Sequence, residues 1–197
     1  MGYTAAMASP RVTERLLTAE EFFKLSDPIE GGKMELVCGK VVTYMPVSGK
    51  HGIRALRIGR SLGDFVDAHY LGEVAVEAGF LVRRTPDTVR APDVSFFSRE
   101  SIPDGGIPEE GFVPFRPTLA IEVVSPDDLD KDVSAKVDDY LEAGVERVWV
   151  VRPRRHTVTV YRHGGTARIV GADGVLTSED AGFSVEGFEL PIDSLFG

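Results

Sequence analysis

The feature that most constrains this chain is a short apolar run that contains one carboxylate. Residues 119–124 read Leu-Ala-Ile-Glu-Val-Val, and Pro117 and Pro126 bound the run. Such a run predicts a central strand that is buried on both faces. Glu122 lies in the middle of it, where a carboxylate is costly unless it is paired, protonated or bound to a metal. Two interpretations stay open: a metal ligand, or one half of a buried ion pair with an arginine or lysine.

The residues that follow complete a strand–helix–strand pattern. A helical pattern covers residues 129–143, and Gly144 stands where a helix C-terminal glycine is expected. Residues 147–151 form a second apolar run. Because the two strands flank a crossover helix, we expect them to be parallel neighbours.

Shorter patterns surround this unit. Thr18 and Glu21 predict a capped helix start, and the long helix should bury a stripe of Ile53, Leu56, Leu62, Phe65 and Val66. Further elements are expected at residues 33–37 with 40–45 (a hairpin), 51–69 (the longest helix), 73–82 (a strand), 83–90 (a turn), 91–97 (a strand), 99–117 (a long loop), and 157–161 with 167–170 (paired strands). The sequence thus predicts an α/β fold: a mixed β-sheet flanked by helices, with an N-terminal β-hairpin. We expect residues 1–17 to be a flexible arm and residues 18–197 to be a single domain.

Composition limits the class of protein. The 197 residues are enough for one domain with a substantial core, and the single cysteine, Cys38, excludes an intrachain disulfide and a cysteine-rich zinc site. No apolar run approaches the ~20 residues of a membrane span, and no signal-peptide pattern opens the sequence. We therefore expect a cytoplasmic protein with no membrane partner. The net charge of −9 weighs against general coating of duplex DNA, since phosphate contacts supply most non-specific affinity.

Three charged residues form a pattern that suits phosphodiester hydrolysis. Asp93 opens one strand, Glu122 follows 29 residues later in the middle of another, and Lys136 lies on the next helix. Two carboxylates on adjacent strands can share Mg²⁺ or Mn²⁺, which prefer oxygen ligands. The metal would acidify a water, and the lysine would orient that water or stabilise developing negative charge.

Several stretches carry a family resemblance. They are Met34-Glu-Leu-Val-Cys-Gly-Lys-Val-Val, Thr88-Val-Arg-Ala-Pro-Asp-Val, Leu119-Ala-Ile-Glu-Val-Val-Ser-Pro, the run from Lys136 to Val151, and Gly187-Phe-Glu-Leu-Pro. With them the chain resembles the Uma-two family of restriction endonucleases, within the PD-(D/E)XK nuclease superfamily, from about residue 18 onward. The resemblance implies a restriction-endonuclease-like core and Asp93 and Glu122 as metal ligands.

One departure from the superfamily pattern concerns the lysine. It would stand two residues after Glu122, where this chain has Val124. Lys136 on the next helix is the matching candidate, and its spacing of four places Tyr140 on the same helix face. The alternative is that Lys136 is an exposed helix lysine and that the site lacks its cation.

Other residues are weaker candidates. Glu35 is a possible further acidic group, Glu77 is a less favoured one, and His51 could carry a proton near neutral pH or be an ordinary residue of a helix start. Lys50, Arg54 and Arg57 are candidates for binding nucleic acid, although solvated surface charge is the commoner role.

The favoured function is a metal-dependent endonuclease on nucleic acid, with DNA the expected substrate. A homodimer would suit an enzyme that cuts both strands, and edge strands near residues 157–170 could supply its contact. One competitor is a degenerate binding or regulatory module that kept the fold without the chemistry. Another is a structural protein in which Glu122 pairs with Arg90 or Lys136.

Overall fold

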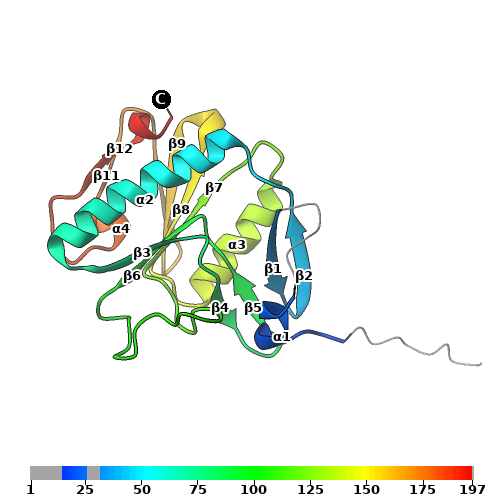
Figure 1. Ribbon diagram of the computed structural model, residues 1–197. Helices are drawn as coiled ribbons and strands as arrows, with labels where there is room; N and C mark the ends of the chain where they lie inside the picture. Colours follow the sequence, from blue (N-terminus) through cyan, green and yellow to red (C-terminus); the bar gives the residue numbers. More distant parts are fainter. Residues whose placement is uncertain (1–14, 26–31, 197) are drawn as a thin grey trace, which may run out of the picture.

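A computed structural model describes residues 15–25 and 32–196 (Figure 1). Most of the expected arm, residues 1–14, lies outside the described residues, and the division into an arm and one domain stays a prediction. The centre of the fold is a six-stranded mixed sheet. In spatial order its strands are β10 (Thr166–Val170), β9 (Thr157–Arg162), β8 (Arg147–Arg152), β7 (Leu119–Val123), β6 (Val94–Ser98) and β3 (Gly72–Val76). Only the β7–β8 pair is parallel in this sheet of the described chain.

The strand–helix–strand unit is confirmed. Strand β7 is buried along its whole length and leads into α3 (Asp130–Glu142), after which Gly144 adopts a left-handed backbone with φ +85°. The alternation of β7 divides its side chains between two layers. Ile121 packs in the core beneath α2 (Gly49–His69), whereas Ala120 packs in the core that includes α3. Glu122 follows Ala120 by two residues, so it points toward α3.

The N-terminal hairpin belongs to a second, four-stranded sheet. Its order is β2 (Lys40–Tyr44), β1 (Lys33–Val37), β5 (Thr88–Arg90) and β4 (Phe80–Arg83). The expected hairpin and the Thr18–Glu21 capping box of α1 (Ala19–Phe23) are confirmed. Leu36 and Val89 pack against α1 in a small apolar core of their own. The alternate residues of β1 and β5 therefore face the other way, toward α3.

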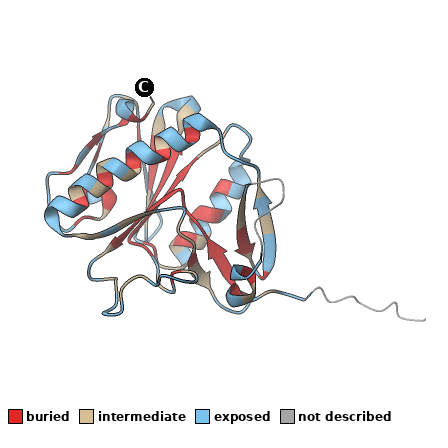
Figure 2. Cartoon of the chain, in the orientation of Figure 1, coloured by how far each residue is buried: buried red, intermediate tan, exposed pale blue. Residues whose placement is uncertain are grey.

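The layers follow from these faces. Helix α2 lies over one face of the six-stranded sheet, and α3 lies between that sheet and the four-stranded sheet (Figure 1). Buried residues concentrate in the central strands and on the inner sides of both helices (Figure 2). The C-terminal part adds β11 (Val175–Thr177), α4 (Ser178–Ala181), β12 (Glu189–Pro191), and two short 3-10 helices, η1 (Pro153–Arg155) and η2 (Ile192–Leu195). Within the described ranges, no helix combines the length and apolar character needed to cross a membrane.

Three sequence predictions about local structure are wrong. Residues 73–82 form two strands in different sheets, because the backbone turns left-handed at Glu77 (φ +54°) and the chain leaves the first sheet there. The turn expected at residues 83–90 ends early, and β5 occupies Thr88–Arg90. The expected stripe of α2 is wrong in part: Ile53 and Leu56 are exposed, and Ala55 and Ile58 are buried in their place. Its other members agree with the structure, since Leu62 and Val66 are buried and Phe65 packs against the same core.

Candidate active site

Four segments converge on one pocket of about 470 Å³ beside α3. Asp93 stands directly before β6, Glu122 lies in β7, Lys136 comes from α3, and Lys33 comes from β1. We call this the acidic pocket, because five carboxylates line it against two lysines. Its charged lining residues are Lys33, Asp93, Glu122, Asp127, Asp128, Asp132 and Lys136.

Glu122 is held by two side chains from the same face of α3. One carboxylate oxygen accepts a hydrogen bond from the Nζ of Lys136 at 3.0 Å, and the other accepts one from the hydroxyl of Tyr140 at 2.5 Å. Burial raises the pKa of Glu122, and Lys136 offsets this only in part while the charge of Asp93 adds to it, so the pKa lies above its ordinary value of 4.5. The prediction that Lys136 and Tyr140 share one helix face agrees with this geometry, and the structure turns that face toward Glu122.

Lys136 is buried and shared between two carboxylates. Its Nζ also lies 3.2 Å from Oε1 of Glu35, which is fully buried behind the pocket. Burial alone would lower the pKa of Lys136, but Glu122 and Glu35 raise it above its ordinary value, so the side chain stays charged. The alternative of an exposed helix lysine is wrong: only 9% of Lys136 is exposed.

Glu35 is held from the other side by an arginine. Its Oε2 accepts from Nη1 of Arg90 at 2.8 Å, and its Oε1 accepts from the backbone N–H of Ala91 at 3.2 Å. Burial would raise the pKa of Glu35, but Lys136 and Arg90 together lower it below its ordinary value. Glu35 is therefore an ionised carboxylate whose two oxygens are occupied by the protein.

Arg90 is the residue of the candidate site whose place the sequence analysis missed. It also donates to Oδ2 of Asp139, from Nε at 2.9 Å and from Nη2 at 2.6 Å. It is therefore paired with Glu35 and Asp139, and Glu122 takes the lysine instead. Residues 83–90 were interpreted as a turn, so the alternation of side chains in β5 was not considered. That alternation points Arg90 inward, beside Glu35. Recognising Thr88–Arg90 as a strand would have revealed it.

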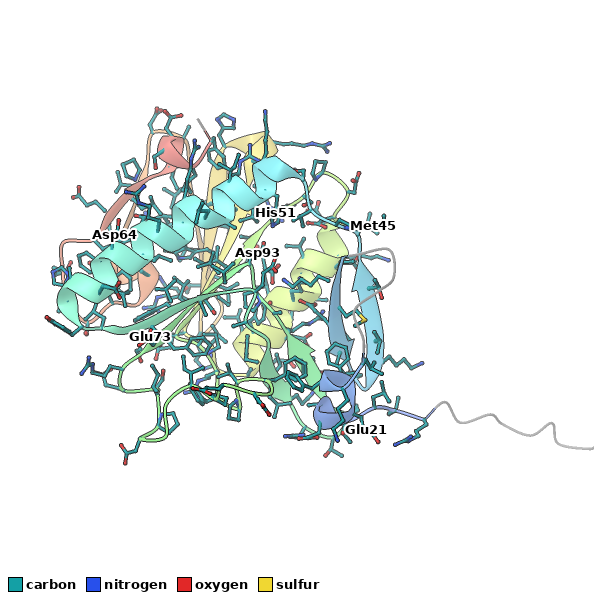
Figure 3. The ribbon with its side chains drawn as sticks, in the orientation of Figure 1. Glu21, Met45, His51, Asp64, Glu73 and Asp93 are labelled. Atoms are coloured by element: carbon teal, nitrogen blue, oxygen red, sulfur yellow. The ribbon has the colours of Figure 1, made fainter. Side chains whose placement is uncertain are left out.

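Asp93 is the carboxylate that faces α2. Its Oδ2 accepts the backbone N–H of Val123 at 2.7 Å, and its Oδ1 lies 3.3 Å from Nε2 of His51 and 3.8 Å from Nζ of Lys33. Burial would raise the pKa of Asp93, but His51, Lys33 and the Val123 amide lower it below its ordinary value. Figure 3 shows His51 on α2 close to Asp93, whereas Asp64 lies much farther along the same helix.

His51 links Asp93 to the end of β7. Its Nδ1 lies 3.1 Å from the Oγ of Ser125, and the imidazole is buried although it stands in the first turn of α2. Direct side-chain contacts therefore link Ser125 to His51 and His51 to Asp93. This placement makes His51 part of the acidic pocket, which its sequence position alone did not require.

The remaining predicted residues lie away from this buried network. Glu77 has an exposed side chain, and its backbone N–H bonds to the carbonyl of Asp93 at 3.4 Å. Lys50 and Arg54 line a neighbouring pocket, whereas Arg57 is exposed one turn further along α2, with its Nη1 3.4 Å from the carbonyl of Ser194.

The donor chemistry of Asp93 and Glu122 fits a hard divalent cation. Within the described ranges, no three or more His, Cys, Asp or Glu side chains are arranged to hold a metal ion. Two carboxylates are nonetheless the protein contribution that Mg²⁺ commonly needs, because it keeps several waters and takes further oxygens from substrate phosphates.

Known proteins resemble this chain over nearly its whole length. The model of the Uma2 family, described as "Putative restriction endonuclease", matches residues 19–193. A solved structure from Anabaena variabilis ATCC 29413, described as "a putative nuclease belonging to DUF820", shares 25% sequence identity and superposes with a TM-score of 0.71. The likeness covers 91% of this chain and 97% of that one. No curated protein matches. The α/β fold class expected from the sequence is confirmed.

Proposed function

The chain belongs to the Uma2 (Uma-two) family, and from that premise we propose that it is a metal-dependent endonuclease that hydrolyses phosphodiester bonds of nucleic acid, with DNA the favoured substrate. One observation carries the proposal: Asp93 and Glu122 meet in one pocket, and Lys136 lies 3.0 Å from Glu122. Val124 stands where the superfamily pattern has its lysine, and the candidate cation is Lys136 on α3, as the sequence analysis expects.

Asp93 and Glu122 would hold Mg²⁺ or Mn²⁺. When bound, such an ion acidifies a water and neutralises charge on a phosphoryl oxygen. Lys136 keeps its proton in the pocket, so its ammonium can stabilise negative charge on the phosphate as the bond to the attacking oxygen forms. His51 orients the carboxylate of Asp93 and contacts Ser125 at the pocket wall.

Glu35, Arg90 and Tyr140 act as positioning residues in this proposal. Glu35 contacts Lys136 at 3.2 Å and is itself fixed by Arg90 at 2.8 Å. Tyr140 donates to Glu122. Because each group is held by a second group, the ammonium and the carboxylate stay in place before substrate arrives, which reduces reorganisation during reaction.

A catalytically degenerate binding module is the second candidate. The observation that favours it is that both oxygens of Glu122, like both oxygens of Asp93, already lie near partners within the protein. A cation would have to share these oxygens or displace a partner. Metal binding therefore separates the two functions.

Cleavage assays with matched variants test the proposal. Wild-type protein, Asp93→Asn and Asp64→Asn would be incubated with supercoiled plasmid, single-stranded DNA and RNA in Mg²⁺ and in Mn²⁺. We expect Asp93→Asn to lose about 100-fold or more in cleavage rate, as loss of a metal-site contact does. Asp64, which is exposed and pairs only with Arg60 among the described residues, is the charge-matched control and should behave as wild type.

Calorimetry decides between the two candidates. Mn²⁺ would be titrated into each protein with and without a non-hydrolysable phosphorothioate oligonucleotide, because a weak site can require substrate phosphate. Micromolar binding that Asp93→Asn abolishes supports the endonuclease. Absence of both Mn²⁺ binding and cleavage in the wild type would contradict it and support the degenerate module.

Two further properties belong to the same proposal. The single cysteine suits a cytoplasmic location, where thiols stay reduced. A homodimer could form through the edge strand β10, on which Ile169 is 71% exposed. Light scattering would test the dimer directly.

A further inference from the structure

A second pocket, of about 400 Å³, adjoins the acidic pocket. The two share a wall made by Ser48, His51, Asp128 and residues 123–126, which are the last residue of β7 and the three that follow it. We call the second one the basic pocket, because five cations line it against two carboxylates, Asp128 and Asp130. Its basic lining residues are Lys50, Arg54, Arg152, Arg154 and Arg155.

These cations come from parts of the chain that are about 100 residues apart. Lys50 and Arg54 lie in the first turns of α2, Arg152 ends β8, and Arg154 and Arg155 form η1. Their convergence is notable in a chain with a net charge of −9, because an average surface of this protein is acidic. In the sequence the two groups are separate, and no local pattern predicts that they lie together. Only the fold places them around one concavity.

Most of these cations are available to a ligand. Lys50, Arg154 and Arg155 are exposed, and within the described ranges the side chains of Lys50 and Arg155 form no ion pair or hydrogen bond. Arg154 makes one contact, from Nη1 to the carbonyl of Pro126 at 3.4 Å. Arg152 pairs with Asp130 at 2.7 Å, but the Asp130 side chain is 77% exposed, so a stronger anion could replace it.

The start of α2 adds to the positive potential. Ser48 caps a helix of 21 residues, and the first turn contains no acidic residue that would neutralise its N-terminal end. A helix N-terminus favours phosphate groups because its backbone N–H groups and its dipole point toward the ligand. Together with guanidinium groups, which match phosphate oxygens in geometry, it makes a site for phosphate.

We propose that the basic pocket binds the phosphate backbone of the same nucleic-acid strand whose scissile phosphate enters the acidic pocket. This inference rests on the proposed endonuclease function. Because the two pockets share a wall, two phosphates of one continuous strand can occupy them together. The basic pocket supplies the affinity for the strand that the acidic pocket, with its excess of carboxylates, cannot. DNA and RNA share this backbone chemistry, and the pocket reads charge rather than base sequence.

Fluorescence anisotropy of labelled 12-nucleotide single strands tests the inference. DNA and RNA of one sequence would be titrated in EDTA with wild type, with the double variant Arg154→Ala/Arg155→Ala, and with Arg60→Ala/Arg99→Ala. The control pair is exposed, removes the same charge and lies outside both pockets. We expect the pocket variant to bind about tenfold more weakly, and its slope of log Kd against log[KCl] to fall by about one, as lost phosphate contacts predict. The control should bind as wild type.

The outcomes separate this inference from the proposed function. Equal affinity and equal salt slope in the two double variants would overturn the basic pocket, even if the wild type cleaves DNA. Weaker binding by the pocket variant alone would uphold the basic pocket, even if the wild type cleaves nothing and is a binding module. Displacement of the 12-mer by inorganic phosphate at equal concentration would overturn it too, since the site would then hold one free phosphate and not a strand.

Discussion

The acidic pocket and the basic pocket share a wall but treat charge in opposite ways. In the acidic pocket, Glu122 and Lys136 are buried and already paired with each other and with neighbours. In the basic pocket, Arg155 and Lys50 are exposed and have no such partner among the described residues. Charges that the protein pairs internally are fixed in position and contribute to the fold. Charges left to solvent cost the fold little and remain free for a ligand.

Loss of Arg90 should give the largest effect on stability. Arg90→Met would remove the guanidinium that bonds fully buried Glu35 and half-buried Asp139. Removing one member of a buried ion pair typically costs about 3–5 kcal/mol. Urea denaturation followed by circular dichroism would measure the free energy of unfolding. Arg99→Met, an exposed position, is the control. An Arg90→Met protein as stable as that control would show that the buried charges do not depend on one another.

Glu122→Gln should have a smaller effect, and one that depends on pH. The folded pKa of Glu122 is raised, so the native state favours the protonated form and this group's stabilisation is fully present below its ordinary pKa of 4.5. That stabilisation is lost as the pH rises through the folded value, at about 1.4 kcal/mol for each unit by which the pKa is raised. Glutamine cannot ionise and escapes the loss. We therefore expect the variant to gain stability over wild type above pH 4.5, as the pH rises through the folded pKa of Glu122.

Denaturation of Glu122→Gln and wild type at a series of pH values measures this difference. A variant less stable than wild type throughout the range would mean that Glu122 serves only as one half of a structural ion pair. Manganese titration of the same variant is the companion measurement, because the endonuclease proposal also requires loss of metal affinity.

Arg154→Ala/Arg155→Ala should have the smallest effect on stability. Both side chains are exposed, and surface substitutions usually change the free energy of unfolding by less than about 0.5 kcal/mol. Thermal unfolding beside wild type would check this. A large loss of stability would mean that these cations support the fold, and the contrast between the two pockets would then fail.

The sequence predicted those parts of the fold that local patterns encode. The buried strand around Glu122, the following helix and the N-terminal hairpin all have apolar periods that match their structure. The prediction of one strand at residues 73–82 was wrong. The apolar alternation continues through these residues, although the backbone turns left-handed at Glu77 and the chain passes from one sheet to the other. The period alone carries no information about a single left-handed residue.

The candidate site was predictable in its members more than in its contacts. Asp93, Glu122 and Lys136 follow from their residue types and from the strands and helix that carry them. The pairing of Arg90 with Glu35, and the contact of His51 with Asp93, depend on how two sheets and α2 meet around α3. No local sequence pattern encodes such long-range packing. The sequence analysis could therefore name Glu35 and His51 as candidates but could not predict which residues they contact.

The delivery of Lys136 from α3 has a consequence for recognising chains of this kind. A text search for an acidic residue followed two positions later by lysine passes over this protein, because Val124 fills that place. A search for an ammonium within about 3 Å of a carboxylate on a central buried strand would retrieve it. A lysine two positions after the acidic residue is only one of several ways to bring an ammonium beside such a carboxylate. The spatial arrangement of the two groups is therefore the more general criterion.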